Sequence, residues 1–379
     1  MARKQSRLGW RFFVLLATMT LALGAGFAAA EERQDFPGAV YTMSNAAGGN
    51  EILVFKRGAN GMLTPAGSVP TGGLGTGAGL GNQGAVVLSR DNQWLYAVNA
   101  GSNEISVFAV DPEGLTLVET VPSGGEIPIS LTVDRKLLYV LHAGGRVGGV
   151  DTITGFTIGT DGKLSPLPGS TKPLSADNTN PAQVGFTPDG DVLVVTEKAT
   201  NIIDTYTVGK DGLASAPMPH PSAGTTPFGF AFGKRSQLFV SEAAGGAPDG
   251  SSASSYLVSG DGGLTTISPS VPTTETAACW AQVSNDGRFA YVANAGSGSV
   301  SGYRIAHDGT IALLDADGRT GVTGAGPTDM AFSNNGRFLY ALRSGSGAIS
   351  AFRAEADGNL LPLPGISGMP AGANGLAVW

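Results

Sequence analysis

The sequence predicts an all-β fold made of similar four-stranded units that close into a ring. Glycine is abundant, at 58 of 379 residues, and charged residues are only 14% of the chain, which is typical of short strands joined by tight turns. A hairpin pattern recurs along the chain, and the two ends each hold part of one unit. Together these observations predict a seven-bladed β-propeller with four-stranded antiparallel blades.

The hairpin pattern is clearest in residues 285–305, NDGRFAYVANAGSGSVSGYRI. A turn at Asn285-Asp286-Gly287 leads into an apolar strand at residues 289–293. After a polar break, a second strand is expected at residues 300–305, ending at the turn Asp308-Gly309. Turn residues of this kind between alternating apolar runs are typical of a β-hairpin.

A turn with glycine in second place marks the start of the last strand in each unit. It occurs seven times, with the glycines at Gly61, Gly114, Gly162, Gly212, Gly262, Gly309 and Gly358. Successive glycines are 53, 48, 50, 50, 47 and 49 residues apart, a period typical of four-stranded propeller blades. A short strand with Leu or Ile should follow each turn, including one at Leu213.

The two ends of the chain are predicted to complete one blade. Inner strands are expected at residues 86–88, 129–133, 184–186, 228–232, 281–283 and 330–332, and a seventh at 376–378. The strand at 39–43 has no first strand before it, and the strand at 376–378 has no second strand after it. Their pairing would close the ring and remove free sheet edges.

The N-terminus predicts a signal peptide at residues 1–30, followed by a single propeller domain at 31–379. Arg3, Lys4, Arg7 and Arg11 precede an apolar run, and an alanine triplet ends at Ala30, the pattern of a cleavable secretory signal. We expect an exported protein, periplasmic or secreted, cleaved near Ala30 and without a stable membrane anchor afterwards.

Charge and composition limit the partners. Removing the four basic residues of the signal from the whole-chain net charge of −7 leaves −11, which argues against nucleic acid. Three dispersed histidines offer no metal-ligand spacing. Asp177, Asn178 and Asn180 form an oxygen-rich cluster that could bind a hard cation, and an Asx-rich turn is the favoured interpretation. We therefore expect no cofactor or metal, a small-molecule ligand, a buried inert Cys279 and a monomer.

Strand parity places the long irregular segments on one face, called here the loop-rich face: residues 72–84, 169–180, 216–226, 243–255 and 319–326. The opposite, tight-turn face carries the short hairpin turns. Binding sites usually lie on long loops of a rigid scaffold. The glycine-rich run 72–81 joins two blades, so we expect a close-packed or flexible loop rather than a dinucleotide site.

One polar residue ends the second strand of each unit and opens toward the loop-rich face. The set is Ser44, Asn99, His142, Glu197, Glu242, Asn294 and Arg343. A histidine and a carboxylate close together can activate water, and a guanidinium can hold an anion or an oxyanion. The alternative is that these residues cap strand ends and bind neighbouring loop amides.

Two phrases carry a family resemblance: LYAVNAGSNEISVF at residues 95–108 and YVANAGSGSVSGY at 291–303. Over residues 38–379 the chain resembles the seven-bladed lactonase propellers, which include bacterial-type 6-phosphogluconolactonases and fungal carboxymuconate-lactonising enzymes, with YVTN-type surface propellers as relatives. The family's strand-end glutamate matches Glu197 and Glu242. Its Pro-Arg-His signature is absent, because the corresponding inner strands read Pro181-Ala182-Gln183, Pro227-Phe228-Gly229 and Pro327-Thr328-Asp329.

The resemblance and the strand-end residues together predict an exported lactonase-like hydrolase or cyclase acting on a small non-phosphorylated acid or sugar derivative. The predicted catalytic residues are Glu197, Glu242 and His142. The predicted substrate-binding residues are Arg343, Asn99, Asn294, Asp329 and Gln183. The alternative is a non-catalytic exported propeller that binds a protein, glycan or small ligand on its loop-rich face.

Overall fold

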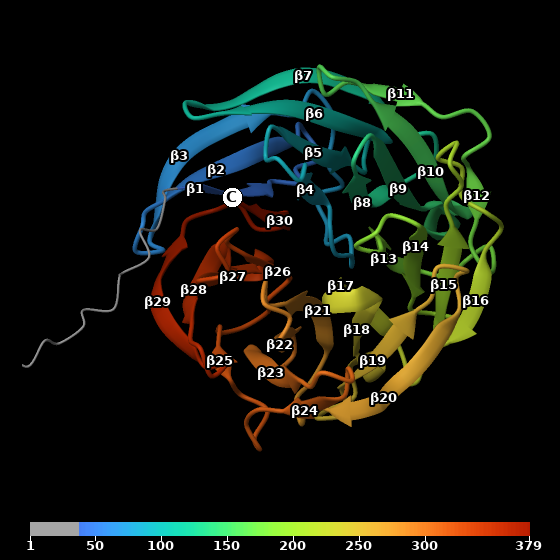
Figure 1. Cartoon of the computed structure of the whole chain (residues 1–379). Helices are drawn as coiled ribbons and strands as arrows, with labels where there is room; N and C mark the ends of the chain where they lie inside the picture. The colour runs from blue at the N-terminus through green and yellow to red at the C-terminus, as the bar shows by residue number, and fades with distance from the viewer. Residues whose placement is uncertain (1–37) are drawn as a thin grey trace, which may run out of the picture. The chain divides into compact units, whose positions relative to one another are not determined.

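The computed structural model describes residues 38–379, which form seven antiparallel sheets arranged in a ring (Figure 1). Each sheet is a meander that runs from the centre of the ring outward, and in two sheets the outer strand is divided into two short segments. The predicted seven-bladed propeller with four-stranded blades is thereby confirmed. The predicted signal peptide lies outside the described residues.

The strands fall into four classes by their distance from the ring axis. The inner strands are β4 (Val86–Leu88), β8 (Pro128–Asp134), β13 (Pro181–Phe186), β17 (Pro227–Phe232), β21 (Ala278–Val283), β26 (Asp329–Phe332) and β30 (Asn374–Val378). The second strands are β1 (Gly38–Met43), β5 (Trp94–Asn99), β9 (Leu137–Ala143), β14 (Val192–Glu197), β18 (Gln237–Glu242), β22 (Phe289–Asn294) and β27 (Phe338–Arg343). The third strands are β2 (Glu51–Arg57), β6 (Glu104–Asp111), β10 (Asp151–Ile158), β15 (Ile202–Thr207), β19 (Ser252–Val258), β23 (Ser299–Ile305) and β28 (Ala348–Ala354).

The outer strands are β3 (Leu63–Pro70), β7 (Gly114–Pro122), β11 (Leu164–Pro166) with β12 (Lys172–Pro173), β16 (Met218–Pro221), β20 (Leu264–Pro272), β24 (Ile311–Leu313) with β25 (Gly321–Val322), and β29 (Leu360–Ser367). Four short 3-10 helices lie in connections: η1 (Gly144–Val147), η2 (Lys234–Ser236), η3 (Ala244–Gly246) and η4 (Ser344–Ser346). Within the described residues, no helix is both long and apolar enough to cross a membrane.

Blade 1 is built from both ends of the chain, and blades 2 to 7 begin at β4, β8, β13, β17, β21 and β26. β1 pairs with β30, with Val40 opposite Val378 and Tyr41 opposite Ala377. Figure 1 shows the red β30 beside the blue β1. The predicted closure is confirmed, and β30 covers the edge of β1 that would otherwise face the ring axis unpaired.

The repeated glycine turn is explained by a contact between neighbouring blades. In four blades a buried tyrosine on the second strand donates its hydroxyl to the carbonyl of the turn glycine in the next blade, as in Tyr139 to Gly212 at 2.8 Å and Tyr291 to Gly358 at 2.9 Å. These glycines have positive φ, 80° and 98° respectively, which glycine adopts without steric cost. The regular spacing of these glycines in the sequence therefore corresponds to hydrogen bonds between neighbouring blades.

Two predictions about outer strands were wrong in detail. Leu213 is in no strand, and only the next residue, Ala214, forms an isolated bridge, with Val208. The outer strand of blade 4 is β16, inside a segment expected to be irregular. Likewise β12 and β25 lie inside the predicted long loops at 169–180 and 319–326. Pro219 and Pro221 lack backbone donors, so β16 can pair only along one side, which an edge strand permits.

Candidate functional site

The strand-end residues predicted as catalytic are buried, and each binds the connection that enters its own blade. His142, Glu197 and Glu242 have no solvent-exposed surface. Each side chain has its own partners, and no hydrogen bond joins any two of the three in the described structure. The expected convergence of these groups at one open site is therefore not observed, and the alternative of strand-end capping describes their contacts.

His142 lies between two hydroxyl groups. Its Nε2 is 3.1 Å from Ser123 Oγ, and its Nδ1 is 3.2 Å from Thr152 Oγ1. Burial lowers the pKa of His142 to about 4, because desolvation disfavours the charged imidazolium. The ring is therefore neutral at neutral pH and links the connection before blade 3 to β10.

Glu197 shares its site with a second carboxyl group, Asp204. The backbone N–H of Ser175 lies 3.0 Å from both Glu197 Oε1 and Asp204 Oδ2, and the hydroxyls of Ser175 and Thr200 donate to Glu197 Oε2. Burial and the neighbouring Glu197 raise the pKa of Asp204 to about 8. Asp204 is therefore mostly protonated at neutral pH.

Glu242 is held by three donors. Gly224 N–H donates to Oε1 at 2.8 Å, Ser254 Oγ donates to the same oxygen, and Ser252 Oγ donates to Oε2. Burial raises the pKa of Glu242, and the hydroxyl and amide donors partly oppose this. A carboxylate with both oxygens occupied in this way tethers the connection before blade 5.

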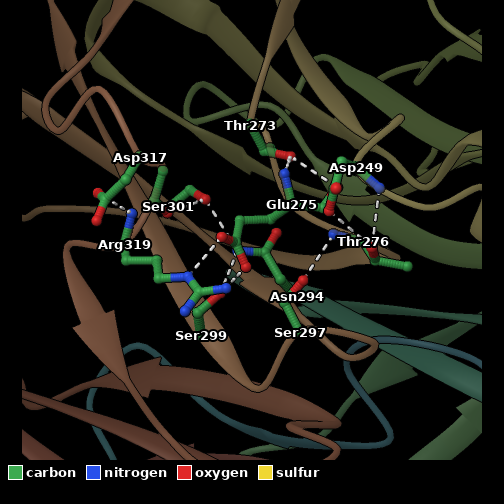
Figure 2. Close-up of polar contacts among 11 residues, drawn as sticks. Asp249, Thr273, Glu275, Thr276, Asn294, Ser297, Ser299, Ser301, Asp317 and Arg319 are labelled. Carbon is green, nitrogen blue, oxygen red and sulfur yellow. Dashed lines mark hydrogen bonds and ion pairs between the residues drawn. The ribbon is translucent and has the colours of Figure 1, made fainter.

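At blade 6 the connection itself supplies the carboxylate, as Figure 2 shows. Glu275 accepts from Arg319 Nε at 2.7 Å and from Ser299 Oγ at 2.8 Å. Asn294 donates to Ser299 Oγ at 3.0 Å and Ser301 Oγ at 2.8 Å, while its Oδ1 is buried without a partner. The predicted substrate-binding residue Asn294 therefore lies inside a polar network with no surface of its own.

Of the other predicted strand-end residues, Asn99 binds the connection that enters its blade and Arg343 differs. Asn99 accepts from Thr71 Oγ1 at 2.7 Å and donates to Ser106 Oγ at 2.7 Å. Arg343 is half-buried beside Gly324, and its Nε has no hydrogen-bond partner. Arg343 is thus the strand-end residue whose contacts leave a donor unused.

Gln183 and Asp329 lie on inner strands and line a cavity of about 540 Å³ on the ring axis. Turn residues Arg90, Asn285 and Asn334 also line it, so this cavity reaches the tight-turn face rather than the loop-rich face. Gln183 is bonded to β17 through Phe230 N at 2.7 Å. Burial raises the pKa of Asp329 to about 8, against backbone amide donors that favour its carboxylate.

Residues 80–83, here called the plug, close the cavity from the loop-rich side. Gln83 crosses the ring from the blade 1–2 connection to β21, where its amide accepts from Ala281 N at 3.0 Å and donates to Ala281 O at 2.8 Å. Trp280 Nε1 donates to Asn82 O at 2.7 Å. Leu80, Asn82 and Gln83 are all buried, so this part of the glycine-rich run is packed into the ring and is not a surface loop.

Two cations lie beside the plug without an acidic partner. Arg146, in η1, donates to Leu80 O at 2.7 Å and to Asn180 Oδ1 at 2.9 Å. Lys198 Nζ donates to Gly81 O and, at 3.0 Å, to Pro181 O. Among residues 38–379 neither side chain forms an ion pair, because all of these acceptors are neutral.

The pKa of Lys198 is lowered to about 7. Desolvation is the main cause and the charge of Arg146 adds to it, while Cys279 and Asp151 act in the opposite direction. The amine also lies 4.7 Å from the centre of the Phe228 ring. Near neutral pH a large fraction of Lys198 is therefore an uncharged amine with a free lone pair, which is the requirement for a general base.

Family comparison agrees with this architecture. The family described as "Lactonase, 7-bladed beta-propeller" matches residues 41–173 and 231–320, more than half of the chain. The chain belongs to this family. No curated protein matches the sequence of this lactonase-family propeller.

Solved structures similar to this lactonase-family propeller share its fold at low identity. A putative 6-phosphogluconolactonase from Bacteroides fragilis is 20% identical, with a TM-score of 0.67 over 92% of this chain and 99% of that one. A putative 6-phosphogluconolactonase from Bacteroides uniformis is 20% identical, with a TM-score of 0.73 over 91% and 100%. The periplasmic gluconolactonase of Pseudomonas aeruginosa is 18% identical, with a TM-score of 0.70 over 90% and 99%.

Sequence reasoning missed the plug, Lys198 and Arg146. Lys198 directly follows Glu197, so the strand-end alignment stopped one residue short of it. The pair Asn82-Gln83 stands just before an inner strand. The family signature was sought only at inner strands that begin with proline, and this strand has none there. Asn180, part of the Asx-rich turn, accepts a hydrogen bond from Arg146. Among the described residues there is no group of acidic, His or Cys side chains able to hold a metal.

Cys279 is buried and unpaired, as expected. Burial raises its pKa to about 12, which keeps it a thiol at neutral pH. A thiol of this kind is a poor nucleophile.

Proposed function

We propose that this protein is an exported lactone hydrolase that acts on small non-phosphorylated hydroxy-acid lactones at the centre of its loop-rich face. The observation that carries the proposal is the pair Lys198 and Arg146, a lysine amine of near-neutral pKa beside a guanidinium without an acidic partner. Membership of the lactonase family supports the same reaction class.

In the proposed reaction, the neutral amine of Lys198 takes a proton from water as the water oxygen attacks the lactone carbonyl carbon. Arg146 stabilises the negative charge that develops on the carbonyl oxygen. The ring C–O bond then breaks, and the leaving alkoxide takes the proton from the Lys198 ammonium. The product is the open hydroxy acid, and Lys198 returns to its neutral form.

The glutamates, His142 and Arg343 keep their predicted roles as hypotheses that the same assay tests. Glu197 and Glu242 bind hydroxyl and amide donors through both oxygens, which supports positioning of the blade connections rather than contact with substrate. Arg343, with its unused donor, is the predicted substrate-binding residue with the most freedom to hold a carboxylate.

The test is proton release by the mature protein with a panel of sugar and aliphatic lactones. We expect Lys198→Met to reduce turnover by about 100-fold or more, the usual scale for loss of a general base. Lys210→Met, in an exposed turn of the same blade, should retain full activity. Full turnover by Lys198→Met together with none by the Glu197→Gln, Glu242→Gln double variant would replace this mechanism with the one predicted from sequence.

A non-catalytic binding propeller is the second candidate. The plug favours it, because residues 80–83 cover the centre of the loop-rich face, and so does the absence of the Arg-His pair from the inner-strand starts. Absence of turnover on every lactone, with retained binding of an acid or sugar, would establish this alternative.

Export is tested separately. The full chain expressed in a bacterial host should yield a periplasmic or secreted product whose N-terminus begins close to residue 31. An intact N-terminus in the cytosolic fraction would contradict export. Size-exclusion chromatography of the product tests the expected monomer.

A further inference from the structure

The plug engages a set of hydrogen-bond donors that converge from three blades. Its oxygen atoms accept four bonds, from Arg146 Nη1, Lys198 Nζ, Trp280 Nε1 and Ala281 N. Two of these donors are the basic side chains of Arg146 and Lys198, and every acceptor is a neutral amide oxygen. Cationic donors prefer charged acceptors, because charge-assisted bonds are about twice as strong as neutral ones.

The plug also donates to the ring. Gln83 N–H donates to Ala182 O at 3.1 Å and Gln83 Nε2 to Ala281 O at 2.8 Å, and Asn82 Nδ2 donates to Ile129 O. The centre of the ring therefore presents both donors and backbone acceptors. The ring of Trp280 adds an apolar surface, packed 5.1 Å from that of Phe228.

The plug satisfies this centre incompletely. Asn82 Oδ1 is buried without a hydrogen-bond partner, and an unpaired buried acceptor destabilises the closed position of the plug. The segment before it is rich in glycine, and Gly72, Gly77 and Gly81 have positive φ. Glycine backbones of this kind can change conformation with little steric hindrance.

We propose that residues 80–83 are an internal stand-in for a ligand, and that a small carboxylate carrying several hydroxyl groups displaces them from the ring. The carboxylate would take the bonds from Arg146 and Lys198, and the hydroxyls would replace the plug at Trp280, Ala281 and the backbone acceptors. This inference deepens the proposed function by naming its ligand class and its gate, and it rests on that function only for the chemical step.

The test uses sodium gluconate, a carboxylate with five hydroxyls that contains no lactone bond, and the mature protein. Isothermal titration measures its affinity, and amide hydrogen exchange follows a peptide covering residues 72–84. Gluconate should increase exchange in this peptide, because the Gln83 amide loses its bond to Ala182 when the plug leaves. Gln83→Ala removes both bonds to Ala281 and should tighten gluconate binding by about fivefold or more, since a larger fraction of the protein is already open.

Gln282→Ala is the matched control. Gln282 Nε2 donates to Met330 O at 2.8 Å between neighbouring inner strands, so its loss removes a comparable amide bond without touching the plug. We expect its gluconate affinity to equal that of the parent. Unchanged exchange in residues 72–84 on gluconate binding would overturn the displacement, and so would equal affinity of Gln83→Ala and the parent.

Lack of gluconate binding by both the parent and Gln83→Ala would overturn the ligand class. The outcome for the proposed function is separate, because it is read from lactone turnover. Gluconate that opens the plug in a protein without lactonase activity would leave this inference standing and remove the proposed function.

Discussion

Replacing Asp204 by Asn should stabilise the protein at alkaline pH. The pKa of Asp204 is raised to about 8 by burial and by Glu197, against about 3.9 in an unfolded chain. Because the folded pKa is the higher one, the stabilising contribution of the protonated form is complete below about pH 4 and is lost as pH rises through about 8. An asparagine keeps an acceptor for Ser175 N–H and a donor toward Glu197, and it does not ionise.

The size of the effect follows from the pKa shift. A shift of this size corresponds to about 5 kcal/mol at pH 8, at 1.36 kcal/mol for each pKa unit. The asparagine side chain is still a buried polar group that costs desolvation, so we expect about half of this gain, about 2–3 kcal/mol. For a domain of this length the melting temperature should rise by about 3–4 °C.

The assay is thermal unfolding followed by circular dichroism at pH 5 and pH 8.5. The gain of Asp204→Asn should be much larger at pH 8.5 than at pH 5. Asp191→Asn, an exposed position in the same blade, should show no such difference. Equal destabilisation of Asp204→Asn at both pH values would refute the argument, because it would mean that ionisation of Asp204 does not affect the stability of the fold.

Three further predictions follow from the fold and the site. Deleting residues 374–379 should leave the protein unfolded or insoluble, as circular dichroism and sedimentation would show, because β30 closes the ring; a soluble product with the parent's spectrum would contradict this. Gly162→Ala should lower the free energy of unfolding by about 2–4 kcal/mol in denaturant titration, because at φ 77° the added Cβ would overlap the Trp94 ring. Gly169→Ala is the control: at φ 79° with open space around it, it should cost about 1 kcal/mol. Equal losses in the two variants would show that packing against Trp94 plays no part. Lactone turnover should rise with pH through about 7 and then level off, as the amine of Lys198 loses its proton; a rate that falls over this range would exclude Lys198 as the base.

The architecture could be predicted from the sequence because the repeat reflects local turn chemistry and a regular blade contact. The glycine turns, the inner strands and the pairing of residues 39–43 with 376–378 were all readable from spacing. The outer strand of blade 4 was placed wrongly, because Leu213 has the repeat's apolar residue while the pairing is made by β16. Pairing partners at a sheet edge are not fixed by the position of one leucine.

The site was harder to predict because its geometry depends on contacts across the ring. Gln83 and Ala281 are 198 positions apart in sequence, and no local pattern connects them. The strand-end alignment correctly found equivalent positions in different blades. What these positions share is a structural contact, because His142, Glu197 and Glu242 all bind a blade connection. Desolvation of Lys198 depends on neighbours from several blades, which the sequence does not display.

The pairing of β1 with β30 also sets an order in time. During synthesis the first blade lacks its inner strand until β30 has been made, about 20 to 70 s after β1 at roughly 5–20 residues per second. Throughout that interval β1 carries an unsatisfied inner edge that another chain could pair with. A protein of this design therefore needs its N-terminal strands shielded until β30 has been made, because the ring cannot close before then.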